Sequence, residues 1–254
     1  MAKLTFEQVR ELFHKDPQTL HWHPEEKQTY TKFHDYYQSG YYKDFIRQLP
    51  GWFVGKKIVI FKIPGTNDEI ARTVQQGIWD LIQEFNLDFD VRYYNLTSSD
   101  PLQASIESFM RSSVANGTLN TQKMISLLVN HSYSQKEKYA YVIVTASRLT
   151  SMIGHALFRE GIILFGLGAN RNLTFIRNLA KHEALHLLGF NFAHHSVIKS
   201  YVEGRQIGLP VHYDGPCNHS QAAFTGIICP VCKQAFTYYL QGLKQASGIN
   251  VFRR

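Results

Sequence analysis

Hydrophobic and polar positions follow two different periods after residue 50, and these periods predict an α/β fold. Short runs rich in β-branched residues indicate strands, which are typically about four to eight residues long. Apolar residues that recur every three or four positions, as at Ile70, Val74, Ile78 and Ile82, indicate an amphipathic helix. The predicted strands are residues 57–63, 89–94, 139–145 and 161–165, and the predicted helices are residues 68–85, 103–110, 121–130, 174–188 and 233–246. Strands and helices that alternate at this spacing form a sheet covered by helices.

The first fifty residues differ from the rest of the chain because they are rich in Tyr, His and Gln. Short helical patterns broken by proline and glycine favour a helical extension over residues 1–50. We therefore expect the main domain to be residues 51–254, with an α/β part at 51–189 and a polar part at 190–254 that carries His and Cys. The helical patterns in the extension are residues 5–14, 25–38 and 42–49.

Composition limits the class of protein. With 254 residues, 44% hydrophobic and 19% charged, the chain can bury a sizeable core and is not a disordered protein. Its apolar runs are too short for a membrane span, and its first ten residues lack the core of a signal peptide, so we expect a cytoplasmic protein without a membrane partner. A net charge of +7 without a dense basic run indicates a solvated basic surface, so nucleic acid is not the expected partner.

Histidine is the residue type that indicates chemistry. Of the 12 histidines, six fall between His182 and His219. His182, Glu183 and His186 form a His-Glu-x-x-His motif inside the predicted helix 174–188. Residues four apart lie on one helix face, so two imidazoles can reach one zinc ion, and Glu183 beside it can accept a proton from bound water. The competing interpretation is a pair of surface histidines on an ordinary helix, and the further ligand-type residues after Gly189 favour the metal.

The motif His182-Glu183-x-x-His186-x-x-Gly189, followed by further histidines, resembles the metzincin zinc metallopeptidases. With Cys217, and Cys229 and Cys232 downstream, it looks most like the archaemetzincins. The resemblance implies a metzincin-like fold, with a mixed twisted sheet, backing helices, an active-site helix, and an irregular zinc-stapled C-terminal part that ends in a helix. It also implies hydrolysis of peptide bonds in a peptide or protein substrate by a zinc-activated water, with Glu183 as the general base.

The third ligand of the catalytic zinc departs from the metzincin pattern. The position three residues after Gly189 is Phe192 instead of His, and we expect His194 to complete the site with His182 and His186. The chain also has no Met after Met152 to form the turn below the metal. The alternatives for the third ligand are His195, His212, His219 and the carboxylate of Glu203, and Tyr213 is a candidate donor to a developing oxyanion.

The cysteines indicate a second metal site. Three cysteines argue against a disulfide framework, and the spacing of Cys229 and Cys232 is typical of a metal site, although core thiols or a redox pair are alternatives. Cysteines hold a structural zinc in the archaemetzincins. The resemblance therefore implies two zinc ions per chain, the second held by His195, Cys217, Cys229 and Cys232.

Two further expectations concern substrate and function. In metzincin-like folds the strand before the active-site helix is an edge that binds peptide, so residues 161–168 are expected to be that edge, with an ordinary sheet strand as the alternative. The alternative functions are a catalytically inactive relative and a zinc-stabilised binding protein, with nucleic acid as one candidate partner. Histidines expected to have only surface or packing roles are His21, His23, His34, His131 and His155.

Overall fold

The computed structural model describes the α/β part of the chain almost completely. The described residues are 49–95, 101–115, 118–130, 139–150, 153–157, 160–168, 170, 172–189, 225–228, 247–253 and positions 233, 236, 237, 240, 241 and 244. The helical patterns expected in residues 1–48 therefore lie outside the described residues. Residues 50–189 and 251–254 form one compact unit, and residues 1–49 with 190–250 are grouped in a second.

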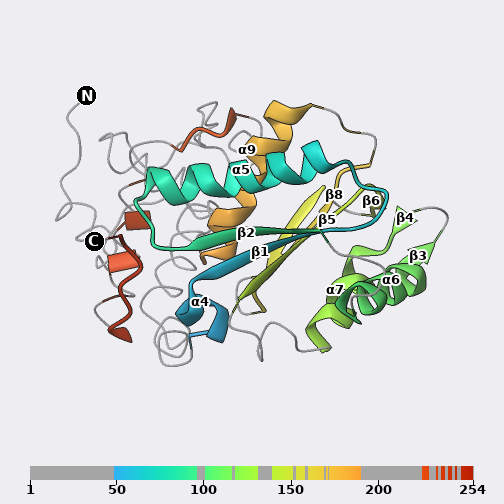
Figure 1. The fold of residues 1–254 in the computed structure, drawn as a ribbon, viewed down its shortest axis with the longest axis horizontal. Helices are drawn as coiled ribbons and strands as arrows, with labels where there is room; N and C mark the ends of the chain where they lie inside the picture. Colours follow the sequence, from blue (N-terminus) through green and yellow to red (C-terminus); the bar gives the residue numbers. More distant parts are fainter. Residues whose placement is uncertain are drawn as a thin grey trace, which may run out of the picture. The chain divides into compact units, whose positions relative to one another are not determined.

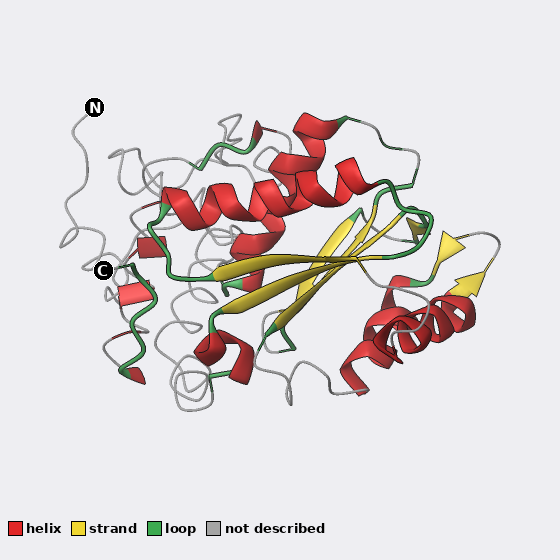
Figure 2. Ribbon diagram, in the orientation of Figure 1, coloured by secondary structure: helices red, strands yellow, loops and turns green. Residues whose placement is uncertain are grey.

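A five-stranded mixed sheet is the centre of the first unit (Figures 1 and 2). Its strand order is β2-β1-β5-β8-β7, in which the first four strands are parallel and β7 runs antiparallel to β8. The bounds are Asp90–Asn95 for β2, Lys57–Lys62 for β1, Ala140–Thr145 for β5, Ile162–Gly166 for β8 and Gly154–Leu157 for β7. The predicted α/β class is confirmed, and the four predicted strands are present with ends within one residue of the prediction.

The strand before the motif helix is not an edge of this sheet, so that expectation was wrong. Strand β8 pairs with β5 on one side and with β7 on the other, and all five of its residues are buried. Its continuous apolar sequence is typical of a strand covered on both faces. The edge next to β8 is β7, and the opposite edge is β2. Strand β7 has only four residues, too few to show a period, and was not predicted.

Helices α5 (Asp68–Glu84) and α9 (Leu173–Leu187) lie on the same side of the sheet (Figure 1). Each begins at an asparagine cap, because the Asn67 side chain accepts a hydrogen bond from the Glu69 backbone N–H and the Asn172 side chain accepts one from Phe175. Gly189 follows α9 with a φ of 87°, as expected for a glycine beyond a helix end. The predicted motif helix is thus confirmed, shifted by one residue at each end.

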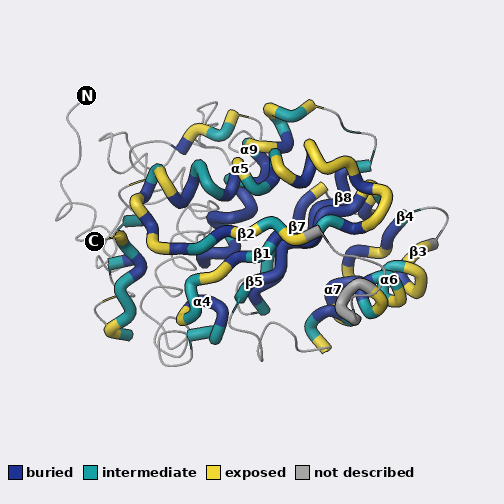
Figure 3. The backbone as a smooth tube through the Cα atoms, viewed as in Figure 1, coloured by how far each residue is buried: buried dark blue, intermediate teal, exposed yellow. Residues whose placement is uncertain are grey.

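Helices α6 (Pro101–Ser113) and α7 (Thr121–Asn130) lie on the other side of the sheet (Figure 1). They pack on alternate strand residues, among them Phe61, Tyr141 and Leu164, whereas the intervening residues face α5 and α9. Most residues of the inner strands are consequently buried (Figure 3). The remaining elements are α4 (Gly51–Gly55) and a small sheet of β3 (Val114–Ala115), β4 (Thr118–Leu119) and β6 (Arg148–Leu149), none of which was predicted.

The end of the chain belongs to the sheet-containing unit. Phe252 forms an isolated β-bridge with Leu87, and the Asp88 backbone N–H donates a hydrogen bond to the carbonyl oxygen of Val251 at 2.8 Å. The described positions from 233 to 247 are helical, in agreement with the predicted last helix. Among the residues described, no helix has the length and apolarity to cross a membrane.

Candidate functional site

The His-Glu-x-x-His residues occupy the last two turns of α9. His182 and Glu183 are buried, with exposed fractions of 5% and 7%, and His186 is half-buried. The competing interpretation of two surface histidines does not hold for His182, because its side chain is buried. His182 and Glu183 are therefore largely removed from solvent.

The two imidazoles converge on a single point. Nε2 of His182 and Nε2 of His186 are 3.1 Å apart, and the ring planes are nearly perpendicular at 84°. Two nitrogens that bind one tetrahedral zinc ion at ~2.0–2.1 Å lie about 3.3 Å apart. The pair thus has the separation of two adjacent zinc ligands. Without a cation, one imidazole N–H must donate to the nitrogen of the other.

The remaining expected ligands lie outside the described residues. His194 and its alternatives His195, His212, His219 and Glu203 fall in this category, as do Tyr213 and the structural set Cys217, Cys229 and Cys232. Within the part of the chain that is described, no group of three or more His, Cys, Asp or Glu side chains is arranged to hold a metal ion. Of the three protein ligands expected for a catalytic zinc, only His182 and His186 are among the described residues, and the zinc site as a whole stays a prediction.

The carboxylate of Glu183 lies between α9 and the edge strand β7. An ideal Cβ added to Gly154 of β7 would lie 2.9 Å from Oε1 of Glu183 and 3.0 Å from its Cγ, so the side chain passes directly over the glycine. Burial raises the pKa of Glu183 to about 7. Among the described residues, no side chain or backbone N–H donates a hydrogen bond to this carboxylate.

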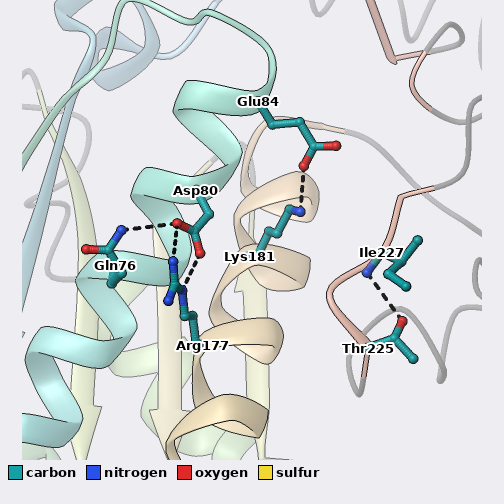
Figure 4. Close-up of polar contacts among 7 residues, drawn as sticks. All are labelled: Gln76, Asp80, Glu84, Arg177, Lys181, Thr225 and Ile227. Carbon is teal, nitrogen blue, oxygen red and sulfur yellow. Dashed lines mark hydrogen bonds and ion pairs between the residues drawn. The ribbon is translucent and has the colours of Figure 1, made fainter.

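The opposite flank of α9 is held by two ion pairs with α5 (Figure 4). The Arg177 guanidinium donates to both carboxylate oxygens of Asp80, at 2.5 and 2.8 Å, and the Lys181 ammonium lies 2.5 Å from a carboxylate oxygen of Glu84. Lys181 immediately precedes His182. The two pairs therefore fix the rotation and axial position of the helix that carries the histidines.

A glycine allows the two helices to approach this closely. An ideal Cβ on Gly77 of α5 would lie 2.2 Å from the backbone oxygen of Arg177 and 2.8 Å from Cβ of Ala180. No methyl group can occupy that space. The close crossing brings Asp80 within reach of the Arg177 side chain.

Sequence reasoning missed the residues that support the motif. Asp80 and Glu84 are four residues apart on one helix, and Arg177 and Lys181 are four apart on another, so matched acidic and basic stripes were a usable signal. The sequence around Gly77 and Gly154 did not indicate that a glycine is needed there, because the group that leaves no room for a side chain is distant in sequence. His155, expected to have a surface or packing role, is half-buried on β7, and burial lowers its pKa.

Comparisons of the chain with protein-family models, curated proteins and solved structures find no match. The geometry of α9 and its neighbours is therefore the basis for proposing a function.

Proposed function

We propose that this protein is a zinc-dependent metallopeptidase of metzincin type, related to the archaemetzincins. One observation supports the proposal most directly. The Nε2 atoms of His182 and His186 lie 3.1 Å apart on the turn that also carries the buried Glu183. A mixed α/β sheet with the motif helix packed on it agrees with the fold that the resemblance implies.

Each residue of the motif has a separate role in this proposal. His182, His186 and a third ligand from the residues after Gly189, for which His194 is the first choice, would hold a catalytic zinc. Bound zinc would supply a Lewis acid for the substrate carbonyl and lower the pKa of its water. Glu183 would accept a proton from the attacking water and deliver it to the nitrogen of the leaving amine as the peptide bond breaks.

The position of β7 favours a peptide as substrate. Among the described strands, β7 has a neighbour only on one side, so its other side offers backbone N–H and C=O groups to an added strand. Gly154 at the start of this strand contacts Glu183. An extended peptide paired with β7 would thus run beside the proposed general base.

The burial of Glu183 favours an enzyme over a zinc-stabilised binding protein. A carboxylate that is 7% exposed and has no donor among the described residues costs folding free energy. A zinc ion that only stabilises a fold requires ligands and no buried carboxylate beside them. Burial that raises the pKa of Glu183 to about 7, and its place next to the histidine pair, both suit a general base.

Metal analysis combined with a peptide-library cleavage assay tests the proposal. Glu183→Ala should retain the catalytic zinc and lose activity by about 10²–10⁴-fold, because general acid–base catalysis contributes that much. His186→Ala should lose one zinc ion together with activity, since it removes a ligand. Glu107→Ala, which changes an acidic residue of α6 outside the site, is the control and should behave as wild type.

The alternatives give different results in the same assay. Wild type that binds zinc through His182 and His186 but cleaves nothing would indicate an inactive relative. Zinc that is lost in Cys229→Ser and unaffected in His186→Ala would indicate a zinc-stabilised binding protein. Two zinc ions in wild type, with one lost in each of these two variants, would support the peptidase with its second, structural ion.

A further inference from the structure

Gly154 lies where the edge strand β7 meets the side chain of Glu183. An ideal Cβ at this position would be 2.9 Å from Oε1, 3.0 Å from Cγ and 3.1 Å from Cδ of Glu183. These three atoms therefore fill the volume that any other residue would need for its own side chain. No other group lies closer to that volume than this carboxylate arm.

The backbone gives no other reason for a glycine here. Gly154 is absent from the described glycines with positive φ, and it pairs in regular register with Phe165 of β8. A glycine inside a strand lowers stability relative to alanine. Its presence is therefore explained by the space that Glu183 occupies.

We propose that Gly154 is a positioning residue, which fixes the location of the Glu183 carboxylate by leaving room for it against the edge strand. This inference rests on the proposed function in so far as Glu183 is the general base. The contact itself is independent of whether the protein is a peptidase. Gly154 acts through shape alone, since it has no side chain to donate or accept a hydrogen bond.

The contact predicts which part of the molecule responds to a substitution. In Gly154→Ala the new methyl group meets the flexible end of a side chain, so Glu183 moves while the strand and the helix stay in place. Displacement of a catalytic group by about 1 Å can reduce the rate by about 10²-fold. The three atoms nearest to the new methyl group all belong to Glu183 and none to His182 or His186, so zinc binding should be retained.

A kinetic comparison tests the consequence for catalysis in the full-length protein. Gly154→Ala should lower kcat by about 10–10²-fold and leave KM and zinc content near those of wild type. In a Glu183→Asp background, where the carboxylate arm is one methylene shorter, the same substitution should cost less. Wild-type kcat in Gly154→Ala, or an equal loss in both backgrounds, would overturn the proposal.

A stability cycle tests the contact without any activity assay. Thermal unfolding is compared for wild type, Gly154→Ala, Glu183→Ala and the double variant. The alanine at 154 should be less favourable in wild type than in the Glu183→Ala background, where its space is free. Ile58→Val, a change in the core of β1, is the control, and its effect should be equal in both backgrounds.

The two proposals can fail separately. Additive effects of Gly154→Ala and Glu183→Ala on the melting temperature would show that the glycine does not fix the glutamate. Wild type that holds zinc and cleaves no peptide would refute the peptidase instead. The stability cycle would then still decide the role of Gly154.

Discussion

The carboxylates of Asp80 and Glu183 lie on opposite flanks of α9, and they differ in their hydrogen bonds and in the direction of their pKa shifts. Asp80 of α5 receives two hydrogen bonds from Arg177 and one from Gln76. Burial raises its pKa, but these donors outweigh burial and hold the pKa below its usual value. Glu183 has no donor among the described residues, and burial raises its pKa to about 7.

The two flanks of α9 therefore differ in role: the α5 flank holds the helix in place, and the β7 flank carries the proposed general base. On the α5 flank, charge pairs and a close backbone approach at Gly77 hold α9 in place. On the β7 flank, Glu183 is positioned by shape against Gly154, and its carboxylate is not neutralised by a cation among the described residues. A carboxylate that must exchange protons cannot also serve as the permanent partner of an arginine.

The largest effect on this arrangement is expected from Gly77→Ala. Its methyl group would meet the backbone oxygen of Arg177, which cannot move aside as a side chain can. Overpacking of this kind typically costs ~1–3 kcal/mol, which exceeds the helix propensity gained from alanine. Urea denaturation should show the loss, and Thr73→Ala on the outer part of α5 is the control. Unchanged stability would mean that the helices separate without cost.

Removing the charge from each carboxylate should change stability in opposite directions. Asp80→Asn weakens a partly exposed ion pair, so we expect a loss of up to ~1 kcal/mol that shrinks at high salt. Glu183→Gln removes an uncompensated buried charge and keeps its shape, so metal-free protein should become more stable. Thermal unfolding of both variants measures the two signs, and equal signs would contradict the contrast between the flanks.

The smallest effect is the pH dependence that Asp80 contributes. Its pKa is lower in the folded state than in the unfolded chain. Its stabilising contribution is therefore fully present above the unfolded pKa, near the ordinary aspartate value of 3.8, and is lost as the pH falls through the folded pKa. In urea titrations below about pH 5, the free energy of unfolding of Asp80→Asn should fall less steeply with decreasing pH than that of wild type. A curve parallel to that of wild type would exclude this contribution.

The order of helices and strands was readable from the sequence because it depends on local patterns. Apolar positions with a helical period predicted both α5 and α9. The short elements β3, β4, β6 and β7 carry too few residues to show a period. The edge of the sheet was therefore assigned to the wrong strand.

The chemistry of the site was also local in sequence, since His182, Glu183 and His186 need only helical geometry to share one face. That information predicts which side chains lie side by side on α9. It does not predict which neighbours hold them, because Gly77, Asp80 and Gly154 lie far away along the chain. Their role depends on a contact made only when the chain folds.

Periodicity and i,i+4 spacing are properties of one segment, so they were sufficient to predict the α/β class, the motif helix and the shared helix face of His182, Glu183 and His186. Three features became visible only in the folded chain. Strand β7 is the edge next to β8, α5 pairs its acidic residues with Arg177 and Lys181, and Glu183 is buried against Gly154. These features arise from packing between segments that are distant in sequence. Each contact depends on the space that the residues of the other segment leave free.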